Sequence, residues 1–154
     1  MTSVYEKFSI GWLKISSHDS KITGIDYADT EGESDEWNEV LRDCARELQE
    51  YFSGERKVFN VEIDFEYKGT AFQQKVWRAL YEIPYGMTIS YKTLAEQCGG
   101  ANYSRAVANA NGKNPLSIIV PCHRVIASDG TLGGYTGGLD KKKHLLKLEN
   151  VILV

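Results

Sequence analysis

The sequence predicts an α+β protein built in two parts, and three observations support this. Short alternating segments near the N-terminus indicate strands that accompany one amphipathic helix. From about residue 70 onward, helix start and stop signals follow one another instead. The charge balance changes at the same place, because residues 1–66 hold 7 Lys and Arg against 16 Asp and Glu, whereas residues 67–154 hold 11 against 5. We therefore expect two domains, 1–66 and 67–154.

The first part alternates apolar and polar residues in the manner of a sheet. Residues 8–16 and 21–29 read as strands separated by the turn-rich segment SHDS, and residues 58–67 alternate as another strand. Between them Ser34 is a candidate N-cap for a helix that ends at Gly54. The apolar face of this helix is formed by Trp37, Leu41, Cys44, Leu48 and Phe52. A three-stranded sheet with one helix is the expected arrangement.

The second part begins with helices. Thr70 and Gln73 form a capping box for a helix that ends before Pro84. Ser90 can cap a short helix closed by a glycine pair, and residues 102–112 read as a second short helix after a tight turn. Two short helices joined in this way, in the basic half of the chain, resemble a helix-turn-helix unit.

The remaining segments lead up to and away from a cysteine. Residues 116–120 read as a buried strand or extended run that precedes Cys122. Asp129–Gly130 is a hairpin turn signal, and residues 140–150 form a final helix with Glu149 near its end. The Lys141–Lys143 run is expected to be a solvated face of that helix.

Composition limits the class of protein. With 154 residues, 42% hydrophobic and 25% charged, the chain is typical of a globular protein. Three widely spaced cysteines and three histidines complete neither a disulfide framework nor a metal-ligand spacing, so we expect no metal and a reducing, cytoplasmic compartment. No apolar run reaches the length of a membrane span, and the N-terminal residues carry charges, so we expect neither export nor membrane insertion.

The basic second half favours a polyanionic partner, although uneven solvation of charge would give the same count. Within this half, the segment IVPCHRVIASDG sets Cys122 beside His123 and Arg124. A free cysteine is usually a small buried hydrophobe, and the alternative is an activated thiolate. Lowering a thiol pKa by three units needs roughly 4 kcal/mol of preferential stabilisation of the anion. Neighbouring side chains on an extended backbone diverge, so His123 could serve Cys122 only through a turn or a bridging water.

The string NPLSIIVPCHRVIASDGTLGGYTGG resembles the signature of the O6-alkylguanine-DNA alkyltransferases. The likeness continues upstream through IPYGMTISYKTLAEQCGGANYSRAVANANGKNP and downstream through GLDKKKHLLKLE, and it covers about residues 70–150. The resemblance implies a ribonuclease-H-like N-terminal domain and a winged-helix-like C-terminal domain. It also implies direct-reversal DNA repair by irreversible, single-turnover alkyl transfer from O6-alkylguanine, with O4-alkylthymine as a second candidate lesion.

The resemblance implies a role for each matching residue. Cys122 would attack the alkyl carbon, His123 would deprotonate it through a water, and Glu149 would orient His123. Asn114 would hold the backbone around this relay, and Tyr91 would donate a hydrogen bond to the guanine ring.

The resemblance also implies a set of residues that contact the base or the DNA. The carbonyls of Cys122 and Val125 would accept from the exocyclic amine of the base. Arg105 would fill the space left by the flipped nucleotide, since chemistry on a base requires extracting it from the stack. The residues expected to contact substrate or DNA are Arg105, Arg124, Val125, Tyr135 and Thr136.

The implied partner is double-stranded DNA containing O6-alkylguanine, bound by a monomer without a cofactor.

Two departures from the family pattern stand out. Ala108–Asn109 occupies positions where members often carry small or glycine residues on the groove-facing helix. The N-terminal part also lacks the cysteine and histidine set that binds zinc in some members.

Several of these residues could instead have a purely structural or nonspecific role. Tyr91 and Tyr135 could be core aromatics, Arg105 a plain phosphate contact, and Glu149 a surface charge. At the level of function, a non-catalytic lesion sensor would replace the acceptor cysteine, commonly with tryptophan, whereas Cys122 is present. A cysteine hydrolase would also want a thiolate beside a histidine, but it needs an oxyanion hole and turns over many times. Stoichiometry separates the three: one alkyl group per protein, none, or many turnovers.

Overall fold

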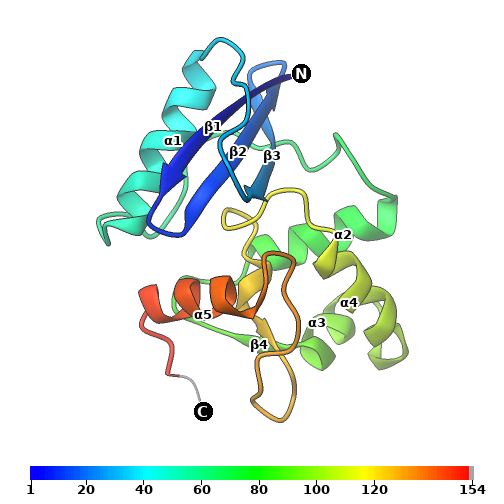
Figure 1. The fold of residues 1–154 in the computed structure, drawn as a ribbon. Coiled ribbons are helices and arrows are strands. Elements are labelled where there is room, and N and C mark those ends of the chain that lie inside the picture. The colour runs from blue at the N-terminus through cyan, green and yellow to red at the C-terminus, as the bar shows by residue number, and fades with distance from the viewer. Residues whose placement is uncertain (153–154) are drawn as a thin grey trace. The chain divides into compact units, whose positions relative to one another are not determined.

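The structure is a computed structural model that describes residues 1–152. The chain divides into two compact units, Met1–Tyr67 and Lys68–Val154 (Figure 1). The first unit combines a three-stranded sheet with a helix, and the second is mainly helical with a small two-stranded sheet. The α+β class predicted from the sequence is therefore confirmed.

The sheet of the first unit is antiparallel and has the strand order β1-β2-β3. Its strands are β1 (Thr2–Phe8), β2 (Gly11–His18) and β3 (Lys21–Ala28). Val4, Ile15 and Ile25 are opposite one another in the register, and all three are fully buried. Helix α1 (Glu39–Phe52) covers one face of the sheet and buries Leu41, Cys44 and Leu48 (Figure 1).

One predicted strand is wrong in position, and another does not form. The stretch 8–16 contains the turn between β1 and β2, and the sheet takes its three strands from residues 2–28. Residues 58–67 form no strand and make one isolated parallel bridge, Ile22 to Ile63. A side chain explains this difference, because the Glu47 carboxylate accepts the backbone N–H groups of Asn60 and Val61, at 2.8 and 3.1 Å.

Helix α1 begins later than predicted. Its N-cap is Asn38, whose side-chain oxygen accepts a backbone N–H of the first turn at 3.0 Å. Ser34, the predicted cap, instead accepts the N–H of Tyr5 at 2.9 Å, and Asp35 accepts the N–H of Ser3 at 2.9 Å. These two polar residues thus cover the outer edge of β1, which has no strand partner on that side.

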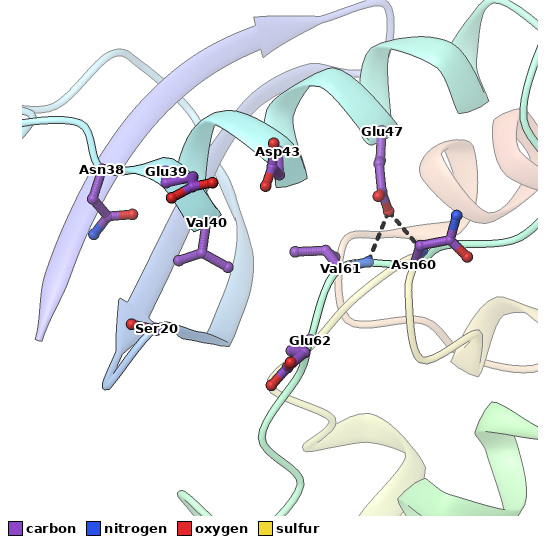
Figure 2. Close-up of a pocket in the computed structure, with 9 residues that line it drawn as sticks. All are labelled: Ser20, Asn38, Glu39, Val40, Asp43, Glu47, Asn60, Val61 and Glu62. Carbon is purple, nitrogen blue, oxygen red and sulfur yellow. Dashed lines mark hydrogen bonds between the residues drawn. The ribbon is translucent and has the colours of Figure 1, made fainter.

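A cavity of about 570 Å³ lies beside α1 in the first unit. Figure 2 shows Glu47 reaching from α1 toward Asn60 and Val61, and both hydrogen bonds meet at the Glu47 carboxylate. Glu47 is 3% exposed although it is acidic, and burial of a carboxylate is tolerated where backbone donors satisfy it. Glu47 therefore ties residues 60–61 to the helix.

The second unit begins with the helices predicted from capping signals. Thr70 and Gln73 form the reciprocal capping box of α2 (Ala71–Tyr81), and Ser90 caps α3 (Tyr91–Gln97) by accepting the N–H of Thr93 at 3.0 Å. Both predictions are confirmed. The Trp77 indole donates to the Ala110 carbonyl at 2.8 Å and so joins α2 to α4 (Ser104–Gly112). The elements of this unit are α2 (Ala71–Tyr81), β4 (Ile89–Ser90), α3 (Tyr91–Gln97), η1 (Ala101–Tyr103), α4 (Ser104–Gly112), η2 (Cys122–Arg124), β5 (Val125–Ile126) and α5 (Leu139–Leu148).

The segment before Cys122 is buried but is not a strand. Residues 116–120 fold into a compact turn in which the Val120 N–H donates to the Leu116 carbonyl at 2.9 Å. Within it Ile118 has φ 76°, a left-handed conformation that a β-branched residue adopts only under constraint. The apolar run at residues 116–120 correctly predicted a buried segment. Its turn redirects the chain toward Cys122.

Within residues 1–152, none of the helices has the length and apolar character of a membrane span. Within the same residues, no group of three or more His, Cys, Asp or Glu side chains is placed to hold a metal ion.

We expect Glu47→Ala to destabilise the protein by about 1–3 kcal/mol, because two backbone N–H groups lose their acceptor. Urea unfolding at neutral pH measures this loss. Glu62→Ala is the matched control, since Glu62 lines the same cavity but is exposed, and its effect should stay within about 0.5 kcal/mol. Equal losses in the two variants would contradict the role given to Glu47.

Candidate active site

Cys122, His123 and Arg124 form the single turn η2, which directly follows the compact turn 116–120. Asn114 holds that turn from inside the protein, since it is 5% exposed. Its Nδ2 donates to the Val120 carbonyl at 2.8 Å, and its Oδ1 accepts the Leu116 N–H at 2.9 Å. Asn114 thereby sets the position at which the cysteine segment begins.

The Cys122 thiol is 1% exposed. Burial raises the pKa of this thiol, while a hydrogen bond from Asn114, the Lys142 ammonium and a hydrogen bond from Tyr135 offset the rise only in part. A resting thiolate of lowered pKa was one of the two sequence-based readings, and the structure instead holds a neutral thiol. A reaction that uses the Cys122 thiolate would therefore need a base close to the thiol.

The neighbour of Cys122 in the chain, His123, is bound to Glu149. The His123 Nε2 lies 2.7 Å from Glu149 Oε2, and both side chains are buried. Glu149 also accepts from Arg124 Nε at 2.8 Å, from Arg124 Nη2 at 3.0 Å and from the Gly86 N–H at 3.0 Å. Burial favours the protonated acid, but the bonds and charges of His123 and Arg124 hold the pKa of Glu149 well below its usual range. Glu149 is ionised.

The charge of Glu149 decides the tautomer of His123. A carboxylate only accepts hydrogen bonds, so the His123 Nε2 carries the hydrogen. Burial lowers the pKa of His123, which leaves the ring neutral and Nδ1 unprotonated. Nδ1 is buried and has no hydrogen-bond partner within residues 1–152. The ring therefore presents one free basic nitrogen, as a general base requires.

Arg124 differs from the expectation that it contacts substrate or DNA. It is 6% exposed, and besides its two bonds to Glu149 it donates from Nη1 to the Ile83 carbonyl at 2.6 Å. A planar guanidinium engaged on both sides in this way has no free face toward a partner. In the structure Arg124 balances the buried charge of Glu149.

A cavity of about 510 Å³ opens in the same unit. The predicted residues Tyr91, Tyr135 and Thr136 all line it. The Thr136 hydroxyl donates to the Gly112 carbonyl at 2.7 Å, and the Tyr91 hydroxyl reaches the Gly134 carbonyl at 3.5 Å. The complete lining is Tyr91, Ala108, Asn111, Gly112, Gly134, Tyr135 and Thr136.

Lys142 is a site residue that the sequence reasoning missed. It was expected on a solvated face, yet it is fully buried and donates from Nζ to the carbonyls of Val125 at 2.7 Å, Gly134 at 3.0 Å and Leu132. Burial lowers its pKa to about 8. The signal was present in the helical period, since Lys142 shares a face with the buried residues Leu145, Leu146 and Glu149.

Of the remaining predicted residues, Val125 lies in the interior and Arg105 on the surface. Val125 is buried, and its carbonyl, expected to accept from a base, already accepts from Lys142. Arg105 and Asn109 are exposed on α4 and line a second cavity, of about 530 Å³, whereas Ala108 lines the first. Helix α4 therefore runs between two hollows.

Sequence profiles match nearly the whole chain. The 6-O-methylguanine DNA methyltransferase DNA binding domain matches residues 71–151, and the ribonuclease-like domain of the same family matches residues 1–65. The structure combines a two-unit α+β fold with a buried cysteine and, next to it in the chain, a buried histidine bound to a glutamate. The chain belongs to the 6-O-methylguanine DNA methyltransferase family.

Individual relatives agree with the profiles. A methylated-DNA–protein-cysteine methyltransferase of Mycolicibacterium paratuberculosis is 46% identical over 145 residues, which cover 91% of this chain and 87% of the relative. One of Methanosarcina acetivorans is 52% identical over 118 residues, or 75% and 74% of the two chains. The crystal structure of Mycobacterium tuberculosis OGT in complex with DNA superposes with a TM-score of 0.86 at 41% identity, covering 97% of this chain and 93% of that one.

Glu149→Gln should cost about 3–5 kcal/mol at neutral pH, because Arg124 then stays buried without its charge partner. The folded-state pKa of Glu149 is depressed, so its stabilising contribution is present above the unfolded value of about 4.3 and is lost as the pH falls below it. Urea unfolding at pH 7, 4 and 3 should show this acid loss in the wild type and a smaller one in the variant.

Glu50→Gln serves as control, because the Glu50–Arg56 pair is at 2.9 Å but partly exposed, and such pairs contribute about 0–1 kcal/mol. An acid profile of Glu149→Gln that matches the wild type would show that Glu149 is not ionised in the folded protein.

Proposed function

We propose that this protein repairs O6-alkylguanine in duplex DNA by moving the alkyl group irreversibly onto Cys122, once per molecule. The observation that carries this proposal is the arrangement of Cys122 next to His123, whose free Nδ1 and Glu149-bound Nε2 make it a base. Family membership supplies the substrate class. A non-catalytic lesion sensor is the weaker candidate, because the acceptor cysteine is present and is accompanied by its base.

The chemistry is a direct displacement. The His123 Nδ1 takes the Cys122 proton through one bridging water as Sγ attacks the alkyl carbon. The S–C bond forms, the C–O6 bond breaks, and the electron pair of that bond leaves with the guanine. The His123 imidazolium is stabilised by the Glu149 carboxylate, at 2.7 Å in the resting protein. The Tyr91 hydroxyl donates to the guanine ring and stabilises the negative charge that develops there.

The product does not return to the starting state. A thioether is a poor leaving group, and neither His123 nor Glu149, the two other side chains of the relay, is a nucleophile strong enough to displace it. Arg124 and Lys142 remain as structural charges around the relay, each held by buried acceptors. Single turnover follows from the chemistry of the sulfur.

The pocket of about 510 Å³ is the proposed receptor for the flipped base. Tyr135 and Thr136 line it, and α3, η1 and α4 form a helix-turn-helix unit that would enter the minor groove. Arg105 is exposed on α4, where it can occupy the stack position that the base vacates. We also infer a cytoplasmic location, because a reducing compartment keeps the acceptor thiol from disulfide formation.

Cys122→Ser should abolish alkyl transfer and leave DNA binding nearly unchanged, because a hydroxyl is hardly ionised near neutral pH. Mass spectrometry after mixing with duplex DNA containing O6-methylguanine measures this. The wild type should gain one methyl group, on Cys122, and no more with time. Cys44→Ser is the control and should behave as the wild type, since Cys44 belongs to the core of the first unit. Continued turnover, or a label on Cys44 or Cys98, would contradict the assignment.

Arg105→Ala should slow transfer from duplex DNA at least about tenfold, while reaction with the free O6-alkylguanine base changes little. The reason is that only the duplex substrate requires extrusion of the base, which costs a few kcal/mol of unstacking. Single-turnover rates on the two substrates measure the difference. Lys113→Ala, which removes another exposed charge next to α4, should weaken DNA binding without this selective slowing. Equal losses on both substrates for Arg105→Ala would point to another role.

A further inference from the structure

One polar atom in the wall of the base pocket has no partner. Asn111 lies on α4, lines the cavity of about 510 Å³ and is 3% exposed. Its Oδ1 is buried and accepts no hydrogen bond from any residue within 1–152. A buried acceptor without a donor costs free energy, so a ligand that brings a donor to this wall gains an interaction that the empty pocket lacks.

The other end of the same amide is committed. Burial raises the pKa of Tyr91, and a hydrogen bond from the Asn111 side chain opposes that rise. A bond that favours the phenolate is donated to the phenol oxygen, so it comes from the Asn111 Nδ2. The two ends of an amide are rigidly connected. Oδ1 therefore lies beside the Tyr91 hydroxyl, on the part of the wall from which Tyr91 would address the base.

The two carbonyls expected to accept from the base are already in use. The Cys122 carbonyl accepts the Val125 N–H, and the Val125 carbonyl accepts the Lys142 ammonium at 2.7 Å. Each carbonyl retains one further lone pair, whereas Asn111 Oδ1 has both lone pairs free. Of these three acceptors, Asn111 Oδ1 has the largest unmet capacity within residues 1–152.

The chemistry of the lesion decides what Oδ1 can bind. Alkylation at O6 removes the hydrogen from N1 of guanine, so the 2-amino group is the only strong hydrogen-bond donor left on the base. This group is attached next to N3, a ring nitrogen that can accept from the Tyr91 hydroxyl. An acceptor adjacent to Tyr91 would therefore meet the 2-amino group when the base is seated.

We propose that Asn111 is a specificity-determining residue whose Oδ1 accepts a hydrogen bond from the 2-amino group of the flipped O6-alkylguanine. The proposal rests on the proposed function and refines its substrate: the pocket selects alkylated purines that carry a 2-amino group. Together, Tyr91 and Asn111 read the N3 and 2-amino edge of the base.

The test compares transfer from two duplexes that differ in one group, O6-methylguanine and O6-methylhypoxanthine, which lacks the 2-amino group. The readout is the ratio of the two single-turnover rates within each variant, so a general folding defect cancels. The wild type should prefer the guanine lesion by about tenfold or more, the size expected for one hydrogen bond to a buried acceptor. Asn111→Leu should reduce the preference to within about threefold.

Two further variants sharpen the result. Asn111→Asp keeps an acceptor oxygen and loses the donor to Tyr91, so it should slow both reactions but retain the preference. Asn109→Leu, on the same helix but lining the other cavity, should leave the ratio unchanged. An unaltered ratio in Asn111→Leu, or a lost preference in Asn111→Asp, would overturn the inference. Failure of the wild type to transfer any methyl group to Cys122 would instead refute the proposed function.

Discussion

The candidate site depends on the buried ion pair between Arg124 and Glu149. Two buried charges are stable only when each compensates the other with good geometry, and here the guanidinium reaches both carboxylate oxygens, at 2.8 and 3.0 Å. This pairing keeps Glu149 ionised in a place where burial alone would protonate it. The ionised carboxylate then dictates which nitrogen of His123 carries the hydrogen. A structural ion pair thus sets the tautomer of His123, the residue proposed as the base.

The same pair also gathers distant parts of the second unit. Arg124 donates to the Ile83 carbonyl, and Glu149 accepts the Gly86 N–H, so the segment after α2, the turn η2 and the end of α5 meet around one charge-compensated centre. Asn114 adds the loop before the cysteine. The thiol is consequently fixed by residues from four separate segments. Such a centre suits a reaction that happens once, because it needs accuracy of placement and no cycle of opening and closing.

Capping signals were the most reliable part of the sequence for the fold. The Thr70–Gln73 box and the Ser90 cap are local interactions, complete within four residues, and both are present. The strands were harder, because side chains compete for their backbone groups at long range. Glu47 captures the N–H groups of residues 60–61, and Ser34 turns to β1 instead of capping α1. Neither of these hydrogen-bonding arrangements can be predicted from the residues that are adjacent in the sequence.

The candidate site shows the same contrast between local signals, which the sequence reveals, and long-range contacts, which it does not. The motif around Cys122 predicted a nucleophile, a base and pocket aromatics, yet it could not show that Arg124 turns inward or that burial raises the pKa of the thiol. Both depend on how much water the folded chain excludes. Asn111 could not be predicted for a related reason. An asparagine in a polar helix suggests no role by its sequence position, and the informative observation is that Oδ1 is buried without a hydrogen-bond partner within residues 1–152.

The Lys142 ammonium has as many hydrogens as there are carbonyls that it binds in the pocket wall. An ammonium carries three hydrogens, and the carbonyls of Val125, Leu132 and Gly134 take one each. The Val125 carbonyl belongs to β5, and those of Leu132 and Gly134 belong to the irregular stretch that follows this strand. A single side chain therefore substitutes for the ladder of backbone bonds that a strand would supply. The shape of the glycine-rich wall is thus encoded some ten residues downstream, in the one lysine of its run that turns away from solvent.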